Sequence, residues 1–445
     1  MNKFIAKNLV YFPVQYLRGL RVKKSIHSIK NNQSLNPNEL RKLQNDKLRK
    51  LIDYAYGNNR YYKNIFDKFN IQSGDIKTID DLKKLPLLSK RDILNNSDSI
   101  MTEKFEEKTY FSQTGGSTGI TLHLKKEVSY LSLRHAIMFR CYSWYNINIG
   151  DRQARFWGVP VTWRLWLNRR IKDLVLNRIR VSAFNISDKE CEKQFKRIIK
   201  YKPAYIYGYT TAIYGFCYFL KKRGINLNNL NLKAVICTAE KMYTHHKTLF
   251  EEMFNCPIVD EYGCAENGII AFPCKYGKMH IMSDHLLVEF IDEKNEPVGV
   301  GEPGRIIITD LNSYAMPLIR YDIGDIGIPS DEKCACGVTL PVMKVIEGRK
   351  EDFIRTIQGK LVHAAYLCYT LKDDTVHEFK MYQKGLENFH VQLVKSPMFD
   401  NNSENILESK LRTALGKDVK IIFEYLDRIP RESSGKLRYF VSEIG

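Results

Sequence analysis

Helical and strand-like segments alternate through the middle of the chain, and this alternation limits the possible fold more than any other feature of the sequence. A helical segment ends near Lys202-Pro203, and the apolar stretch Ala204–Tyr207 follows and is closed by Gly208. Two further strand-like stretches are Leu232–Cys237 and Ile258–Asp260. Short apolar runs separated by helices are typical of α/β proteins with buried strands. We therefore expect an α/β fold.

The pattern changes toward both ends of the chain. Asn36-Pro37-Asn38-Glu39 predicts a helix start, because asparagine caps, proline suits the first turn and glutamate can reach back to the cap. After Asp284 the sequence shows strands instead, at Leu286–Ile291 and Gly304–Thr309. Turn-rich segments separate them, so a β-rich subdomain is expected there.

Beyond Gly348 the chain mixes strand patterns with one helical pattern, Ser403–Leu415. We expect a large N-terminal domain over residues 1–350. A small α+β domain over residues 351–445 would form a mobile lid, hinged near Glu351.

Length and composition allow a large core, since the chain has 445 residues, 44% of them hydrophobic. The net charge is +19, but no nucleic-acid-binding motif accompanies it, so no nucleic acid partner is expected. No apolar run approaches the roughly 20 residues of a membrane span, and no signal-peptide pattern follows the first residues. The sequence therefore predicts a cytoplasmic protein.

The segment Met1–Lys24 combines apolar and basic side chains. A helix of this kind could rest on an anionic leaflet, which predicts peripheral contact at the inner membrane face. The alternative is a helix that packs on the domain and exposes a basic outer face.

A glycine- and hydroxyl-rich segment reads Thr114-Gly115-Gly116-Ser117-Thr118-Gly119. Glycines let backbone N–H groups approach an anion, and hydroxyls can bind phosphate oxygens, so a triphosphate cradle is expected. The segment lacks the Gly-Lys-Ser/Thr of a Walker loop. Taken alone, it could equally be a hairpin turn.

A second motif reads Tyr262-Gly263-Cys264-Ala265-Glu266. Tyr262 offers an aromatic face for a base, Gly263 adds no bulk behind it, and Glu266 could hold Mg²⁺ against phosphates. A strand end followed by a loop would account for the same residues.

Three further segments complete the set. Asp325 offers two acceptor oxygens to ribose hydroxyls, although a turn aspartate would look the same. Arg320 and Arg349 would add positive charge if the segments converge. Lys436 could reach an α-phosphate from a loop near the C-terminus, although an ordinary exposed lysine is the simpler explanation.

In this order along the chain, the motifs describe ATP-dependent activation of a carboxylate. They resemble the adenylate-forming ligase superfamily, which includes acyl- and aryl-CoA synthetases, peptide-synthetase adenylation domains and luciferases. Within it, the chain is similar to the phenylacetate-CoA ligase branch and its CapK-like proteins of capsular polysaccharide biosynthesis. That narrower likeness also uses Tyr61-Tyr62 and Leu85-Pro86-Leu87-Leu88-Ser89-Lys90.

The resemblance implies the same roles for the motif residues, from phosphate binding at Thr114–Gly119 to acyl-adenylate formation at Lys436. It further implies that the small domain rotates about Glu351 and that Gly359 lines the path of an incoming thiol or amine. Thr121 and Ala265 depart from the superfamily pattern, which often has proline and a hydroxyl residue there. Glu351 replaces the usual aspartate.

Aromatic residues suggest a pocket for a small acid, because their bodies are apolar and their tips polar. The candidates are Phe156 and Trp157, with Tyr207, Gly208 and Tyr209 from the segment Tyr205–Thr210. Core packing is the alternative for each of them.

Three cysteines and one histidine form a candidate structural zinc site: Cys274, His280, Cys334 and Cys336. A Cys₃His set closes a tetrahedral site and leaves no position for catalysis. Unliganded thiols and imidazole are the alternative.

The sequence thus predicts an ATP- and Mg²⁺-dependent ligase that forms an acyl-adenylate and passes the acyl group to coenzyme A, an amine or a sugar hydroxyl. Surface polysaccharide biosynthesis is the expected context. The alternative is a catalytically idle nucleotide-binding scaffold at the membrane.

Overall fold

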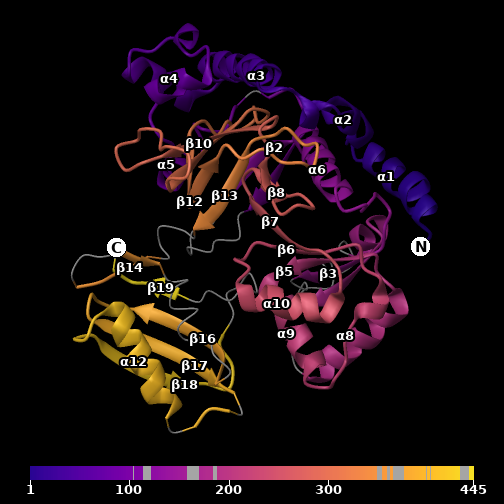
Figure 1. Cartoon of the computed structure of the whole chain (residues 1–445). Coiled ribbons are helices and arrows are strands. Elements are labelled where there is room, and N and C mark those ends of the chain that lie inside the picture. The colour runs from indigo at the N-terminus through magenta and orange to yellow at the C-terminus, as the bar shows by residue number, and fades with distance from the viewer. Residues whose placement is uncertain are drawn as a thin grey trace. The chain divides into compact units, whose positions relative to one another are not determined.

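The computed structural model describes residues 1–103, 105–113, 122–157, 170–183, 188–347, 353–357, 361–363, 375–396, 398–400, 402–430 and 440–444. Contacts within the chain divide it into two compact units (Figure 1). The large unit comprises Met1–Ile323 and Gly327–Val345, and the small unit comprises Gly324–Ile326 and Ile346–Gly445.

An eleven-stranded sheet organises the large unit, in the order β10-β11-β12-β13-β9-β8-β7-β6-β5-β3-β4. Its parallel part consists of β3 (Gln153–Trp157), β4 (Arg178–Ser182), β5 (Tyr205–Tyr209), β6 (Val235–Thr238) and β7 (Ile258–Cys264). The other strands are β8 (Gly268–Pro273), β9 (Met279–Ile281), β10 (Leu286–Ile291), β11 (Gly304–Asp310), β12 (Tyr321–Ser330) and β13 (Val342–Glu347). The predicted α/β region and β-rich region are therefore two parts of one sheet.

Helices cover both faces of the parallel part. Figure 1 shows α8 (Asp188–Tyr201), α9 (Thr210–Lys221) and α10 (Thr244–Phe254) together beside these strands. Their apolar side chains form one core with Phe156 and Val235. Side chains of α6 (Val128–Ser143) form a second core with strand residues such as Tyr205 and Val259. Burial on both faces explains why these strands are apolar almost without interruption.

The N-terminal region is helical, as predicted. It comprises the π-helix η1 (Ile5–Tyr11), α1 (Phe12–Leu17), α2 (Val22–Ile29), α3 (Pro37–Asn58), α4 (Arg60–Lys68) and α5 (Lys90–Asn95), with short 3₁₀ turns η2 (Asn32–Ser34), η3 (Ser73–Asp75) and η4 (Ile79–Lys84). The capping box predicted at Asn36 and Glu39 is present, with N–H···O distances of 3.0 and 2.9 Å. Helix α3 ends at Asn58, and the Asn59 side chain caps α4.

The small unit contains a four-stranded sheet in the order β18-β17-β16-β19. Its elements are β14 (Phe353–Arg355), β15 (Leu361–His363), β16 (Val376–Gln383), β17 (Asn388–Lys395), α12 (Ser403–Leu415), β18 (Lys420–Tyr425) and β19 (Phe440–Ser442). This is the expected α+β composition. In the part of the chain that the structure describes, no helix is both long and apolar enough to cross a membrane.

Candidate functional site

The turn between β7 and β8 lies where the sheet changes from parallel to antiparallel pairing. Strand β7 pairs parallel with β6 and antiparallel with β8. A register shift falls between Tyr262 and Gly263. At Gly263 a Cβ atom would lie 2.3 Å from the carbonyl oxygen of Gly268, so only glycine fits this close approach.

Glu266 lies in this turn and is largely buried. The hydroxyl of Tyr321, at the start of β12, donates to its Oε1 over 3.3 Å. Arg134 of α6 donates from Nη1 to the carbonyl oxygen of Ala265 over 3.3 Å. Strand β12 and helix α6 therefore fix the turn that carries Tyr262 and Glu266.

A buried polar network extends from this turn to the strand that follows the glycine-rich segment. The carboxylate of Asp310 accepts from Asn267 (3.3 Å) and from the Tyr130 hydroxyl (2.6 Å), and it pairs with the Lys126 ammonium (3.4 Å). Burial alone would raise the pKa of Asp310, but Lys126, His285 and the Tyr130 hydrogen bond outweigh it and lower that pKa. The ionised pair joins β2 (His123–Glu127) to the Glu266 turn.

The glycine-rich segment Thr114–Gly119 itself lies outside the described residues. The strands that flank it, β1 (Thr109–Gln113) and β2, pair antiparallel from Thr109↔Glu127 to Gln113↔His123. Arg349, Glu351, Gly359 and Lys436 also lie outside the described residues.

An aromatic cluster lies on β3 and β5. The Trp157 ring is 4.1 Å from that of Tyr209 and stacks on Tyr207 at 5.8 Å, between ring centroids. The guanidinium of Arg155 lies 4.3 Å above the Trp157 ring. Arg155 and Trp157 alternate with Phe156 along the strand, so they share one face of the sheet.

Glu261 is buried below this cluster. The Tyr207 hydroxyl donates to Oε1 and the Tyr142 hydroxyl to Oε2, each over 3.2 Å. Burial raises the pKa of Glu261, although these hydrogen bonds act in the opposite direction. Tyr207 is therefore held by a carboxylate at its polar tip and by Trp157 at its ring.

Phe156 does not join this cluster. Its side chain is buried in the core against Phe216 of α9, with ring centroids 5.3 Å apart. Phe156 belongs to the core cluster of α9 and α10, and Trp157 packs against the same cluster while remaining only partly buried. Gly208 has a packing role, because a Cβ atom there would lie 2.3 Å from the carbonyl oxygen of Phe156.

Arg320 is engaged inside the large unit. Its Nη1 donates to the carbonyl oxygen of Leu85 over 2.7 Å, and its Nη2 lies 3.0 Å from a Glu289 carboxylate oxygen. Its backbone φ is +51°, a left-handed conformation that is strained for arginine. Asp325 follows within β12. In this structure the Arg320 guanidinium is occupied by Leu85 and Glu289.

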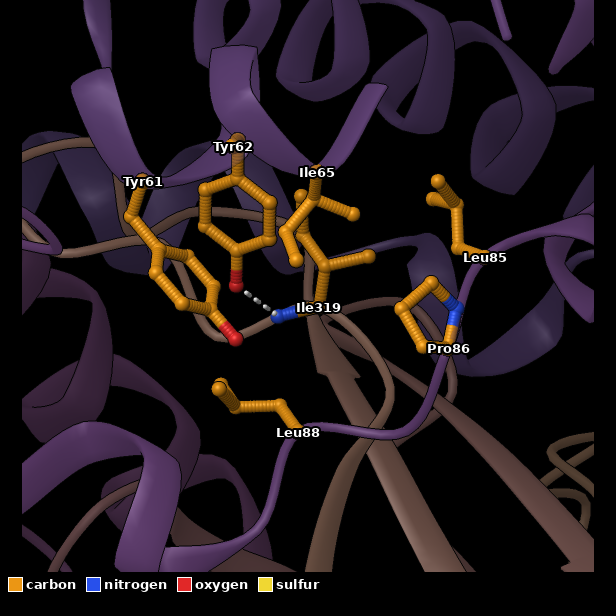
Figure 2. A pocket seen from close by; sticks show the side chains of 7 residues that line it. All are labelled: Tyr61, Tyr62, Ile65, Leu85, Pro86, Leu88 and Ile319. Atoms are coloured by element: carbon orange, nitrogen blue, oxygen red, sulfur yellow. Dashed lines mark hydrogen bonds between the residues drawn. The ribbon is translucent and has the colours of Figure 1, made fainter. Parts of the chain in front are cut away.

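The two segments that carry the narrower resemblance meet in a small apolar pocket (Figure 2). It is lined by Tyr61, Tyr62, Ile65, Leu85, Pro86, Leu88 and Ile319. The Tyr62 hydroxyl donates to the carbonyl oxygen of Pro317 and accepts from the Ile319 N–H, both over 3.0 Å. These motifs therefore anchor the N-terminal helices to the segment that leads into β12.

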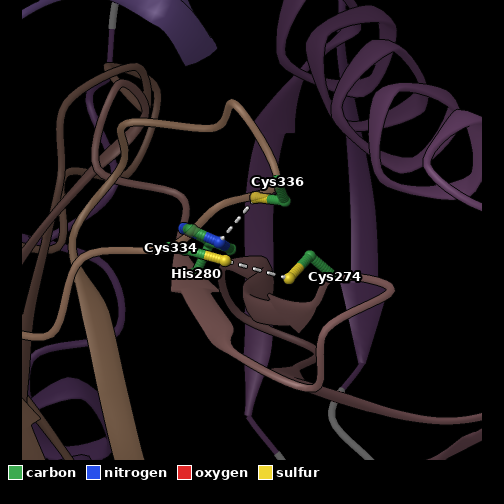
Figure 3. A group of neighbouring side chains, drawn as sticks. All are labelled: Cys274, His280, Cys334 and Cys336. Carbon is green, nitrogen blue, oxygen red and sulfur yellow. Dashed lines mark hydrogen bonds between the residues drawn. The ribbon is translucent and has the colours of Figure 1, made fainter.

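The predicted metal ligands come together (Figure 3). The four ligand atoms of Cys274, His280, Cys334 and Cys336 all lie within 4.8 Å of one another. The Cys274 and Cys334 sulfurs are 3.5 Å apart, and the Cys336 sulfur is 3.3 Å from His280 Nε2. Tetrahedral zinc with ordinary bond lengths requires ligand separations of about 3.3–3.8 Å.

The second nitrogen of His280 also suits a metal ligand. Nδ1 lies 2.8 Å from the carbonyl oxygen of Leu340, which leaves Nε2 facing the thiols. The ligands come from the end of β8, from β9 and from the segment between β12 and β13. A metal ion at this position would link these three segments and stabilise their arrangement.

The sequence is similar to known ligases over almost its whole length. It is 26% identical to the CapK protein of Staphylococcus aureus over 429 residues, which cover 92% of this chain and 90% of that protein. It is 22% identical to a phenylacetate-coenzyme A ligase of Thermus thermophilus over 437 residues, which cover 91% and 97%. The family model of the CapK C-terminal domain matches residues 354–443.

The fold agrees with these relatives. A structure of 2-hydroxyisobutyryl-CoA ligase with 2-HIB-AMP aligns with a TM-score of 0.76 at 17% identity and covers 93% of this chain and 92% of the ligase. These comparisons support the adenylate-forming superfamily, and within it the phenylacetate-CoA ligase and CapK-like branch, as the relatives of this chain. The comparisons support an AMP-forming ligase activity.

Several polar residues around the superfamily motifs escaped the sequence interpretation. Asp310 and Lys126 are buried charges. Asp310 ends the largely apolar strand β11, but Lys126 is one of two adjacent lysines in the polar strand β2 and has no distinguishing signal. Glu261 stands directly before Tyr262, but nothing local indicates that Tyr142 and Tyr207 bind it. Such partners lie more than fifty residues away along the chain.

Proposed function

We propose that this AMP-forming ligase activates a small carboxylic acid as an acyl-adenylate and transfers the acyl group to a thiol, amine or hydroxyl acceptor. The observation that carries the proposal is the fixed β7–β8 turn, which presents Tyr262 and Glu266 in a chain related to CoA ligases over about nine-tenths of its length.

In the first step a carboxylate oxygen attacks the α-phosphorus of ATP, and pyrophosphate leaves. We assign Thr114–Gly119 to the phosphates, Tyr262 and Gly263 to the adenine, and Asp325 to the ribose. Mg²⁺ held by Glu266 would neutralise phosphate charge. Lys436 and Arg349 would stabilise the charge that develops at the α-phosphate.

In the second step the acceptor attacks the acyl carbon and AMP leaves. Relatives named phenylacetate-coenzyme A ligases support coenzyme A as the acceptor. We propose an amine or a sugar hydroxyl of a surface polysaccharide precursor as the alternative acceptor, a suggestion that rests on the CapK name alone. Rotation of residues 351–445 about Glu351 would switch the protein from the arrangement that forms the adenylate to the arrangement that transfers the acyl group.

We place the acid beside Trp157, Tyr207 and Tyr209. These rings form one face, Gly208 keeps β5 close to β3, and the Glu261 carboxylate holds the Tyr207 hydroxyl. Arg155 lies over the same rings, so the site suits an acid with a polar or negatively charged substituent.

Pyrophosphate release with a panel of carboxylic acids tests the activity. We expect release that depends on ATP, Mg²⁺ and one class of acid, and a reduction of at least about 100-fold in Glu266→Gln because a charged metal ligand is lost. Glu293→Gln, an exposed position on the same unit, is the control. No acid-dependent release from folded wild-type protein would instead favour the idle scaffold, which no observation supports at present.

We propose a structural zinc ion at Cys274, His280, Cys334 and Cys336. Elemental analysis of the purified protein should find about one zinc per chain, as one tetrahedral site predicts. Cys334→Ser should lose the metal and unfold at a lower temperature, whereas Cys256→Ser, a thiol outside the cluster, should retain it. Zinc-free protein of unchanged stability would contradict the assignment.

A further inference from the structure

The N-terminal helices expose an unusual set of apolar side chains. In η1 and α1 the buried residues are Ala6, Tyr11 and Gln15. The opposite side carries large apolar residues that are mostly open to solvent: Phe4 (67% exposed), Leu9 (65%), Tyr16 (62%) and Leu17 (84%). We call these four residues the N-terminal apolar surface. A helix that faced only water would place polar groups there.

This segment is attached to the large unit and is not a loose tail. The Tyr11 hydroxyl bonds to Nδ1 of His135 over 2.7 Å, and the Lys3 ammonium pairs with Asp151 at 3.2 Å. The segment also packs tightly against Gly150, because a Cβ atom at that position would lie 2.5 Å from the carbonyl oxygen of Lys3. The apolar surface is therefore presented by a folded support.

Positive charge surrounds the N-terminal apolar surface. The first 38 residues contain seven lysines and arginines and no aspartate or glutamate. Lys23 and Lys24 begin α2 and are exposed, and the Arg21 guanidinium lies 4.0 Å above the exposed Tyr16 ring. An apolar face ringed by cations, with an aromatic at its edge, matches the interface of a bilayer with anionic headgroups.

We propose that the N-terminal apolar surface docks this protein on anionic lipid membranes. Phe4, Leu9, Tyr16 and Leu17 enter the headgroup region, while Lys23, Lys24 and Arg21 contact lipid phosphates. The sequence left open a helix with a basic outer face packed on the domain. The structure favours membrane contact, because the outer face of η1 and α1 is apolar and its basic residues flank it.

Vesicle pelleting of the full chain tests the proposal without any substrate. At about 0.1 M salt, binding to vesicles of phosphatidylcholine with phosphatidylglycerol should exceed binding to phosphatidylcholine alone by on the order of tenfold, and salt should weaken it. The double variant Leu9→Ser/Leu17→Ser should reduce anionic binding by a similar factor. Val300→Ser/Met398→Ser changes two other apolar residues that are also more than half exposed, and this variant should bind normally.

Charge is tested separately. Lys23→Glu/Lys24→Glu should weaken binding to anionic vesicles, whereas Lys193→Glu/Lys196→Glu on α8, with the same change in net charge, should have a smaller effect. Equal binding by wild type and Leu9→Ser/Leu17→Ser, or no binding by either, would overturn the proposal. A dimer that Leu9→Ser/Leu17→Ser dissociates, without vesicle binding, would also overturn it and assign the surface to a second copy of the chain.

Discussion

The contacts of Arg320 within the large unit favour a structural role for this motif residue. Its side chain is almost fully buried and pairs with Glu289. Burial raises the pKa of the Glu289 carboxyl, and the positive charge of Arg320 opposes this rise. We expect Arg320→Met to lower the free energy of unfolding by about 3 kcal/mol, because it leaves a largely buried carboxylate without its partner. Urea unfolding measures this change.

Glu289→Gln added to Arg320→Met should recover part of that loss, since it removes the uncompensated charge. An Arg320→Met protein of normal stability with a raised KM for ATP would contradict the structural role and return Arg320 to the nucleotide site.

Asp260, two residues before Tyr262, should make stability depend on pH. Burial raises the pKa of its carboxyl to about 7, with Glu261 adding to the effect and Lys241 opposing it. The folded protein thus keeps this proton at pH values where the unfolded chain has lost it. Stability should therefore fall as pH rises from about 4 to 7, by at most about 1.4 kcal/mol per pH unit from this group.

Unfolding of Asp260→Asn across the same pH range checks the assignment, because the variant should lack this component. Asp53→Asn, at an exposed position on α3, should leave the wild-type pH dependence in place. Identical profiles for wild type and Asp260→Asn would show that Asp260 titrates normally.

Among the elements, the β7–β8 hairpin depends on glycine at a single close approach. Gly263→Ala puts a methyl group 2.3 Å from the Gly268 carbonyl oxygen, so the two strands must separate. We expect a loss of about 1–3 kcal/mol in unfolding free energy and slower pyrophosphate release, because Tyr262 and Glu266 move with the strand.

Gly57→Ala in α3 is the matched control, since a Cβ atom there would meet nothing within 4 Å. It should be neutral or stabilising by up to about 1 kcal/mol. If both variants behave alike, the close approach at Gly263 does not determine the geometry of the turn.

Elements with strong local signals were predicted well. The α12 helix has the predicted bounds, Ser403–Leu415, and β10 coincides with the predicted Leu286–Ile291. Both depend on local periodicity. The sequence could not show that the β-rich segments continue the same sheet, because β7–β8 pairing is decided by contacts between strands.

Some residues of the candidate site could be predicted from the sequence and others could not, again because local patterns do not show contacts between distant residues. The four residues of the Cys/His cluster, which the structure brings together, could be predicted from the sequence because thiol and imidazole groups have specific metal-binding chemistry. Phe156 was assigned to the acid pocket by residue type, and the alternation along β3 places it in the core instead. The Asp310–Lys126 pair joins residues 184 positions apart and has no local signal.

At the scale of the whole molecule, the chain consists of two units, and the proposed mechanism requires motifs from both to act on one nucleotide. Tyr262 and Glu266 belong to the large unit, whereas the CapK C-terminal domain match, residues 354–443, includes Lys436. If Lys436 serves only the first step, its loss should affect the two half-reactions differently. A domain that moves between the two half-reactions would produce this difference, whereas a single rigid site would not.

We therefore expect Lys436→Ala to lower acid-dependent pyrophosphate release by about 100-fold or more, because it removes a cation from the developing negative charge. The same variant, supplied with synthetic acyl-adenylate, should transfer the acyl group to its acceptor at close to the wild-type rate. Lys384→Ala, an exposed lysine of the same unit, should leave both rates unchanged. Equal losses in both half-reactions would mean that Lys436 stays at the nucleotide throughout, and the proposed rotation about Glu351 would then have no role in exchanging the two steps.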